Sequence, residues 1–459
     1  MSKKNKKTDS VSVVGRITHF LYQDGKGLDC SQQVTFFLLF SGLVYLELFL
    51  VEPARRYIGD NDFVLNNKHI LAIIAAGLTA NAFLYILVYH LIGRIKVSFR
   101  HFFGVYAVFA FVLAFVWPIG SDDIFSYVYQ GRILSIHHAN PFINSYDQFS
   151  HDQFYPAISN YWSGSFVPYG PLFVYCSAMS SWLGQSSIWL SLILFKTFMV
   201  LAHLFSVYLV YKISNFKTFF LYALNPLVIF EFIINGHNDA LVVLAVVLSI
   251  YFLRKYSGMK GQLLACLFLL ISALIKLPTV LLWPFLGIML FWDNFKKKQG
   301  LVFTLMAIGL TVGSLIVAYA PVFSNFQAIA QPIINQSKLS EFYSPGILLI
   351  FFMVNIFQQA DAIDRSVLLG RLVFVGIYGY IFLKTFLARG VNYQDNFIKM
   401  ASWVMTCFCL IFMTFLLPWY FGLPMILCML SFDITQEKRY LYVVYFFTFY
   451  GILHYLILR

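Results

Sequence analysis

The chain has 459 residues, of which 60% are hydrophobic and only 11% are charged. A soluble domain carries about 25% charged residues, so this composition excludes an ordinary soluble protein and predicts an all-α polytopic membrane protein. The 32 basic and 20 acidic residues give a net charge of +12. In a membrane protein this excess of basic residues is expected in the cytoplasmic loops, so it does not indicate nucleic-acid binding.

Apolar stretches separated by short polar or basic segments set the organisation of the chain. Residues 1–30 predict a polar cytoplasmic tail, and residues 31–459 predict a single membrane-embedded domain. Basic residues at the ends of apolar stretches mark the cytoplasmic side, because positively charged loops stay inside. We expect about eleven spans in a helical bundle, at 34–51, 70–93, 102–118, 188–213, 219–234, 240–253, 263–292, 301–320, 368–387, 397–417 and 440–458.

The longest polar interval between these stretches is residues 119–168, which positive-inside parity assigns to the extracytoplasmic side. It is rich in aromatic residues and large enough to build a site. With histidine neutral its net charge is −3, from Asp122, Asp123, Asp147, Asp152 and Arg132.

This interval opens with SDDIFSYVYQGRILSIHHANPF, which predicts a helix lying on the membrane surface. Ser121 or Asp122 suits the N-cap, and Asn140-Pro141 should stop the helix. One polar face of the helix should carry three residues at i, i+4 and i+7, namely Asp123, Tyr127 and Gln130.

Asp123 has two interpretations. It is either a helix-capping or solvated acid, or a general base that accepts the proton of an attacking hydroxyl. The first helical turn favours an ionised carboxylate, which keeps a base charged but also weakens it.

Lys276 is the most informative charge in the membrane part. It interrupts an apolar stretch at Ile275–Pro278, where a lysine costs about 2.5 to 3.5 kcal/mol and usually faces a cavity or a partner. Snorkelling to the interface is one explanation. The other is an ammonium that binds phosphate near the outer interface, between two half-helices.

The motif GHND places His237 and Asp239 two residues apart, where they could orient one another, bind a ligand or form an ordinary turn. The six cysteines form no CxxC pair and predict neither a disulfide framework nor a zinc site. We find no residue set that would bind a metal.

Five motifs in order carry a resemblance: SDDIFSYVYQGRILSIHHANPF, VPYGPLF, NPLVIFEFIINGHNDAL, ALIKLPTVLLWPF and LLPWY. Over about residues 119–420 the chain resembles bacterial polyprenol-phosphate-mannose-dependent α-1,6-mannosyltransferases, which are multispanning glycosyltransferases of the GT-C superfamily.

The resemblance implies transfer of one sugar, with mannose favoured, from a polyprenyl-phosphate donor to a hydroxyl on a glycolipid or cell-envelope glycan. It implies a bacterial plasma-membrane protein with its site on the outer face, in contact with membrane lipids and without a cofactor. Asp123 would be the base of an inverting displacement, with Asp122 at a variable position beside it. Donor phosphate would contact Lys276, Arg132 and His237. Substrate would contact Tyr127, Gln130, Tyr169, Asn238, Asp239, Trp419 and Tyr420.

Two other functions use the same residues. A transporter or flippase of polyprenyl-linked sugars would need the lysine and the acidic loop but no base. A ligase would move a whole lipid-linked glycan. The size of the product separates the three, because a transferase adds one sugar, a ligase adds a glycan, and a transporter makes no bond.

Overall fold

The computed structural model describes most of the chain from residue 68 onward. The predicted tail at 1–30 lies outside the described residues, as does the first predicted span at 34–51 apart from Gly42. The described residues are 42, 68–92, 98–119, 121–159, 162–338, 343–355, 362–387 and 392–457.

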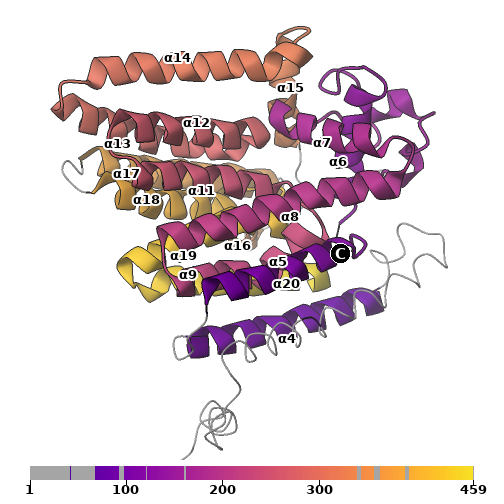
Figure 1. Ribbon diagram of the computed structural model, residues 1–459, viewed down its shortest axis with the longest axis horizontal. Coiled ribbons are helices and arrows are strands. Elements are labelled where there is room, and N and C mark those ends of the chain that lie inside the picture. Colours follow the sequence, from indigo (N-terminus) through magenta and orange to yellow (C-terminus); the bar gives the residue numbers. More distant parts are fainter. Residues whose placement is uncertain are drawn as a thin grey trace, which may run out of the picture.

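In these ranges the regular secondary structure is helical and contains no strand, which confirms the predicted all-α class. Figure 1 shows long helices side by side along one axis, with α14 at the top and α4 at the bottom. The α-helices are α4 (Lys68–Ile92), α5 (Phe99–Ala114), α6 (Asp123–Ser135), α7 (Pro171–Gly184), α8 (Ile188–Ile213), α9 (Phe216–Ala223), α10 (Pro226–Val228), α11 (Asp239–Lys255), α12 (Met259–Ile275), α13 (Trp283–Lys296), α14 (Gly300–Tyr319), α15 (Phe326–Lys338), α16 (Pro345–Asn355), α17 (Ala362–Leu387), α18 (Tyr393–Cys407), α19 (Gly422–Thr435) and α20 (Lys438–Ile457). The shorter 3-10 and π turns are η1 (Tyr146–Phe149), η2 (Tyr155–Ala157), η3 (Ile229–Ile234), η4 (Leu277–Leu282), η5 (Ala320–Val322), η6 (Phe408–Phe412) and η7 (Pro418–Phe421).

Polar caps start several of these helices. The Ser187 side chain accepts a hydrogen bond from the N–H of Leu190 at the start of α8. Asn225 caps α10 by accepting from Leu227 and Val228, at 3.1 and 3.2 Å. Such caps satisfy N–H groups that the first turn leaves without an intrahelical partner.

The predicted count of eleven spans is not confirmed. In the described part of the chain, six helices are long and apolar enough to cross a membrane, and a bent pair formed by α9 with α10 and η3 raises this to seven. The pair bends by 48°. The six are 72–90, 188–213, 277–296, 300–322, 362–387 and 393–412.

The predicted break at Lys276 is confirmed. Helix α12 ends at Ile275, and Lys276 has an extended backbone with φ −150° and ψ 121°. The 3-10 turn η4 follows from Leu277, with Pro278 as its second residue, and leads into α13. A second irregular segment, the π-helical turn η3, precedes the GHND motif.

The prediction of a surface helix over residues 121–140 is wrong in two respects. Helix α6 ends at Ser135, and the N–H groups of Ile136 and His137 both bond to the carbonyl of Arg132. Every α6 residue from Asp123 to Ile133 is buried, chiefly against α7. Apolar side chains occur all round this helix, and such helices pack inside a protein.

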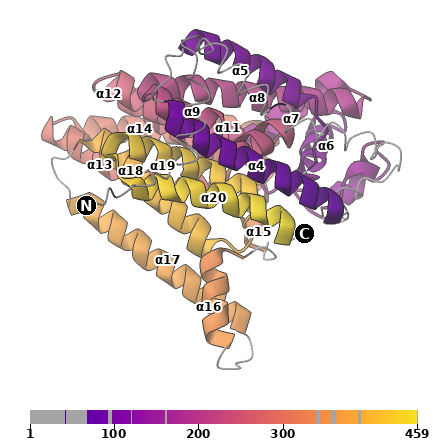
Figure 2. The ribbon, with the colours of Figure 1, turned by 90° about the horizontal axis from the view of Figure 1, so that it is seen from below.

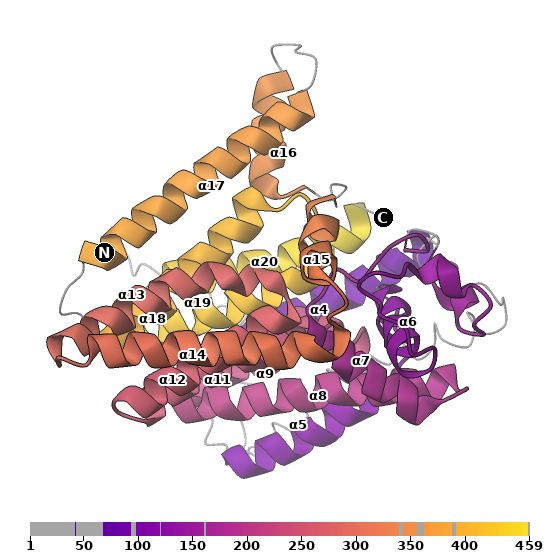
Figure 3. The same cartoon turned by 90° about the horizontal axis from the view of Figure 1, so that it is seen from above.

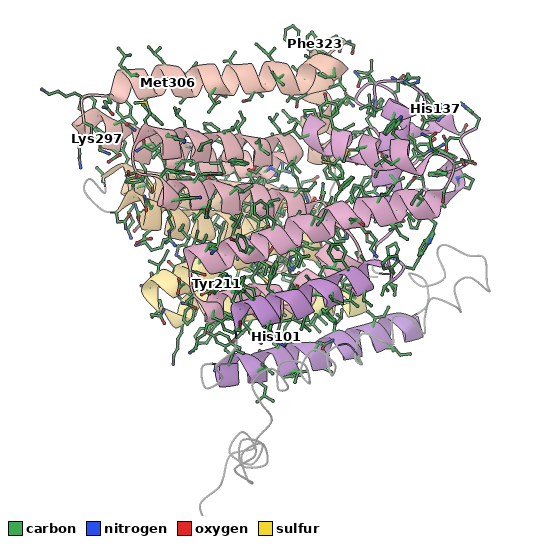
Figure 4. All side chains as sticks on the ribbon, in the orientation of Figure 1. His101, His137, Tyr211, Lys297, Met306 and Phe323 are labelled. Carbon is green, nitrogen blue, oxygen red and sulfur yellow. The ribbon has the colours of Figure 1, made fainter. Side chains whose placement is uncertain are left out.

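The 121–170 segment gathers at one end of the bundle. Figure 4 shows His137 at this end and Lys297 at the opposite end. On another side, α16 and the adjoining part of α17 project away from the remaining helices, as Figure 2 and Figure 3 show. Both features shape the candidate site, because the segment supplies polar groups and α17 supplies one wall of a groove.

Candidate functional site

Helix α6 presents one buried carboxylate and one partly exposed carboxylate. Asp123 is 6% exposed, and its backbone N–H donates to Ser121 Oγ at 3.2 Å. Asp122 occupies the N-cap position, and its side chain makes no capping hydrogen bond to the described residues. Ser121 therefore contributes the polar contact predicted for the helix start.

Two aromatic donors hold the Asp123 carboxylate. The indole N–H of Trp162 donates to Oδ1 at 3.1 Å, and the hydroxyl of Tyr127 donates to Oδ2 at 3.3 Å. Hydrogen bonds from neutral donors stabilise an ionised carboxylate and fix its orientation. The predicted shared face of Asp123 and Tyr127 is confirmed by this contact.

Tyr127 is the centre of a wider network. Its hydroxyl accepts from the Tyr169 hydroxyl at 3.3 Å and lies 3.2 Å from His237 Nδ1. Burial, followed by the nearby Tyr169 and Asp123, raises the pKa of Tyr127 well above its usual value. Tyr127 is therefore a neutral phenol with a proton to donate.

The GHND turn brings His237 against α6. Gly236 has φ +71°, a backbone conformation that residues with a side chain rarely adopt, so this turn needs glycine. The His237 ring stacks on Trp419 with centroids 3.7 Å apart. Nε2 lies 3.4 Å from a Glu231 carboxylate oxygen. Nδ1 adjoins the Tyr127 hydroxyl, so the ring is held between Tyr127 and Glu231, and the phosphate contact of His237 stays a prediction.

Lys276 forms a buried ion pair with Asp239. Its ammonium donates to Asp239 Oδ2 at 2.7 Å and lies 3.7 Å from the centre of the Tyr420 ring and 6.0 Å from that of Tyr169. The N–H of Gly170 donates to the carbonyl of Ile275 at 3.0 Å, which joins the loop segment that carries Tyr169 to the helix break at Lys276.

Asn238 lies between His237 and Asp239 in the GHND motif, and its side chain is fully buried. Within the part of the chain that the structure describes, neither its side-chain oxygen nor its nitrogen has a hydrogen-bond partner. An unsatisfied buried amide costs about 1 to 3 kcal/mol. Asn238 is therefore available to a polar ligand.

A largely apolar groove of about 830 Å³ adjoins the ion pair. It is lined by α17, η4, η6 and the stretch that leads to Tyr420, and Arg371 is the charged residue of its lining. Arg371 Nε is buried and has no hydrogen-bond partner among the described residues. A cavity of about 20 Å³ beside Asp239 and Lys276 shares Pro278, Phe408 and Tyr420 with the groove.

Arg132 belongs to a separate cluster. Its Nε and Nη2 donate to the Asp152 carboxylate at 2.9 to 3.0 Å, and its guanidinium carbon lies 3.8 Å above the Phe154 ring. His137 Nε2 lies 2.7 Å from the same carboxylate. Burial raises the pKa of Asp152, but hydrogen bonds from Arg132, Phe154 N–H and His137 outweigh it, so the pKa lies below its usual value. The structure therefore does not support a phosphate contact by Arg132.

Gln130 also lies outside the network. It donates to Ser177 Oγ at 3.2 Å and accepts from Tyr146 at 3.5 Å, so it joins α6 to α7 and to the following loop. Of the twelve predicted site residues, the structure gathers nine: Asp123, Tyr127, Tyr169, His237, Asn238, Asp239, Lys276, Trp419 and Tyr420.

The sequence analysis assigned no site role to Trp162, Glu231, Asp152 or Arg371. Nothing in the sequence distinguishes Trp162 from the many aromatic residues that anchor proteins at membrane interfaces. Glu231 and Arg371 did give a signal, because each is an ionisable residue inside an apolar stretch, where a function or a partner is the default expectation.

Comparison with known protein families assigns the chain to one of them. A model described as alpha-(1->6)-mannopyranosyltransferase, N-terminal domain, matches residues 50–292, more than half of the chain. Comparisons with curated proteins and with solved structures found no match. The matched region contains Asp123, the GHND motif and Lys276. The chain thus belongs to the alpha-(1->6)-mannopyranosyltransferase family and is a membrane glycosyltransferase.

Proposed function

We propose that the protein transfers one sugar, with mannose favoured, from a polyprenyl-phosphate donor to an acceptor hydroxyl. The observation that carries this proposal is the continuous set of contacts from Asp123 through Tyr127 and Tyr169 to Lys276, beside an apolar groove. It pairs a candidate base with a candidate phosphate ligand and with room for a lipid.

Asp123 is the proposed base. The acceptor oxygen attacks the anomeric carbon as the bond from that carbon to the phosphate oxygen breaks, and Asp123 takes the hydroxyl proton. A single displacement of this kind inverts the anomeric configuration. Polyprenyl phosphate departs as a stabilised anion, so the leaving group needs no general acid. The hydrogen bonds from Trp162 and Tyr127 support this role by fixing the carboxylate.

Lys276 is the proposed ligand of the donor phosphate. Its ammonium is a compact charge with three donors, and the Asp239 carboxylate and Tyr420 ring hold it at the helix break. Phosphate would share the cation with Asp239, and the charge that develops on the leaving oxygen would be stabilised there. The unsatisfied amide of Asn238 is available to a sugar hydroxyl or phosphate oxygen.

The apolar groove is the proposed site of the polyprenyl chain. Its volume of about 830 Å³ falls within the range of small-molecule sites. It reaches the ion pair at Tyr420, so a lipid in it would end in a phosphate beside Lys276. Arg371 adds a second positive charge along the same path.

We infer further that the site faces away from the cytoplasm of a bacterial cell. The 121–170 segment lies at one end of the bundle and Lys297 at the other. Basic residues in the last turns of α8, α11 and α13, at Lys212, Arg254, Lys255 and Lys296, favour the second end as cytoplasmic. The acceptor is then an extracytoplasmic glycolipid or cell-envelope glycan.

Radiolabelled sugar transfer tests the proposal. Purified wild type, Asp123→Asn and the matched control Asp122→Asn are each given a panel of sugars on short-chain polyprenyl phosphates, with membrane acceptors. We expect mannose transfer by wild type and by Asp122→Asn, and a loss of about 10²-fold or more in Asp123→Asn with donor binding retained.

Full activity in Asp123→Asn would contradict the base assignment. Products that carry a whole glycan would favour a ligase. Lipid movement across vesicles without a new bond would favour a transporter. Failure of every polyprenyl-phosphate sugar, with transfer from another donor class, would overturn the donor assignment.

A further inference from the structure

Glu231 is a buried carboxylate that the proposed reaction has not yet used. It lies in the π-helical turn η3 and is 1% exposed. Burying a carboxylate is costly unless partners compensate it, so its surroundings should reveal its role. Turns of this π-helical type occur frequently at functional sites.

Three side chains from different positions converge on this carboxylate. The Tyr455 hydroxyl donates to Oε1 at 2.5 Å, and the Asn235 amide donates to Oε2 at 3.3 Å. His237 Nε2 lies 3.4 Å from the same Oε2. Tyr455 and Asn235 therefore fix the carboxylate with Oε2 beside the imidazole.

The other side of the imidazole faces the proposed base. His237 Nδ1 lies 3.2 Å from the Tyr127 hydroxyl, which lies 3.3 Å from Asp123 Oδ2. A line of groups thus runs from Asp123 through Tyr127 and His237 to Glu231. Each gap is short enough for a hydrogen bond to form or to tighten when substrate binds.

We propose that Glu231 is a positioning residue that makes His237 the final acceptor of the proton that Asp123 removes from the acceptor hydroxyl. This inference rests on the proposed function of Asp123. Asp123 passes its new proton to the Tyr127 oxygen while the original Tyr127 proton moves to His237 Nδ1. The products are an Asp123 carboxylate, a neutral Tyr127 and an imidazolium whose charge Glu231 compensates.

The physical reason is charge stabilisation in a buried place. A carboxylate next to an imidazole holds it in one tautomer, with the facing nitrogen protonated, and stabilises the imidazolium. Here Nε2 would carry the hydrogen toward Glu231. Nδ1 would be unprotonated, so it can accept the Tyr127 proton once the protonated Asp123 donates to the Tyr127 oxygen. Stacking on Trp419 fixes the plane of the His237 ring.

Other charged and titratable groups also surround this turn and enter any pH dependence. Lys196 of α8 approaches Gly236 with its Cγ, and its ammonium donates to the carbonyl of Val116. The groups that face His237 or its direct partners are Asp123, Tyr127, Tyr169, Lys196, Glu231, Asp239 and Tyr455.

The pH profile of kcat/KM tests the inference. Neutral His237 is needed to accept the proton, so wild-type activity should fall on the acid side as the imidazole becomes protonated. Glu231→Gln keeps the size of the side chain but removes the negative charge. We expect at least a tenfold loss at the plateau and an acid limb displaced to lower pH, because the imidazolium loses its counter-charge.

Two further variants separate positioning from folding. Glu231→Asp keeps the charge and should keep the acid limb near that of wild type even where the rate falls. In a Tyr127→Phe background the route to His237 is cut, so adding Glu231→Gln should cost less than about twofold more. Chromatographic behaviour and thermal midpoint confirm that each variant is folded.

The outcomes distinguish this inference from the proposed function. Full activity of Asp123→Asn overturns the base and the relay together. An inactive Asp123→Asn with an unmoved acid limb in Glu231→Gln, or fully additive losses with Tyr127→Phe, overturns the role of Glu231 and leaves the base in place.

Discussion

The Lys276 ammonium lies 2.7 Å from the Asp239 carboxylate, and both side chains are buried. The cation that we assign to the donor phosphate is thus neutralised by the protein until donor arrives. Bound phosphate must share or replace that contact, so Asp239 sets how strongly Lys276 attracts an anion.

This pairing predicts a stability pattern. Asp239→Asn leaves a buried ammonium without its counter-charge and should destabilise the protein by about 3–5 kcal/mol. The double variant Asp239→Asn/Lys276→Gln should unfold at a higher temperature than Asp239→Asn alone, because no unpaired charge is left. Thermal unfolding in detergent measures both.

The control for this pattern is Lys297→Gln, which breaks the half-exposed pair with Asp293. Such exposed pairs contribute about 0–1 kcal/mol, so the control should unfold close to wild type. A double variant as unstable as the sum of the two single variants would contradict the argument.

The groove predicts a dependence on the lipid. Val375 lines the groove on α17, whereas Leu372, also exposed on α17, does not. Val375→Trp should fill part of the groove and raise KM for long-chain polyprenyl donors by about tenfold, with less effect on the shortest donors. Leu372→Trp should match wild type. Equal KM values for all chain lengths in Val375→Trp would exclude this groove as the lipid site.

The contact between α6 and α7 predicts a sensitive glycine. A Cβ at Gly131 would lie 2.2 Å from the carbonyl oxygen of Ser177, so backbone must move to admit it. Gly131→Ala should destabilise the protein by about 1–3 kcal/mol and lower transfer by displacing Asp123. At Gly104 a Cβ meets nothing within 4 Å, so Gly104→Ala should keep the stability and the transfer rate of wild type. Wild-type transfer rates in Gly131→Ala would show that α6 tolerates the shift.

The Arg132 cluster predicts acid sensitivity of the 121–170 segment. The folded-state pKa of Asp152 lies below its usual value, so its stabilising effect is present above about pH 4 and is lost as the pH falls through the folded-state pKa. Amide hydrogen exchange of residues 145–158, corrected for intrinsic rates, should therefore accelerate as the pH falls from 5 to 3. Asp152→Asn should exchange faster at pH 5 and show a smaller acceleration. An equal acceleration in both proteins would assign the effect to other groups.

Much of the candidate site follows from local sequence rules. Asp123 and Tyr127 share a helix face because they are four residues apart, and Lys276 lies at a break because Pro278 follows it. Neither inference required knowledge of the remaining chain. Both are confirmed where geometry tests them, although the catalytic and phosphate-binding roles stay predictions.

Long-range partners could not be inferred in the same way. The charge of Arg132 alone suggested a phosphate-binding role. Its guanidinium instead donates hydrogen bonds to the carboxylate of Asp152, 20 residues later. Gln130 shares its helix face with Asp123, but packing of α6 on α7 turns it toward Ser177. The number of spans cannot be inferred from local sequence either, because apolar stretches that pack inside the bundle have the same composition as those that cross the membrane.

The π-helical turn at Ile229–Ile234 has a consequence for how related sequences are aligned. Each residue of a helix advances the chain by about 100°, so removing one residue from this turn would rotate His237 and Asp239 away from Asp123 and Lys276 even if every motif residue were kept. The number of residues in this turn is thus as much a part of the site as the residues themselves. A relative with a gap here would need a compensating insertion before Asn235 to build the same arrangement.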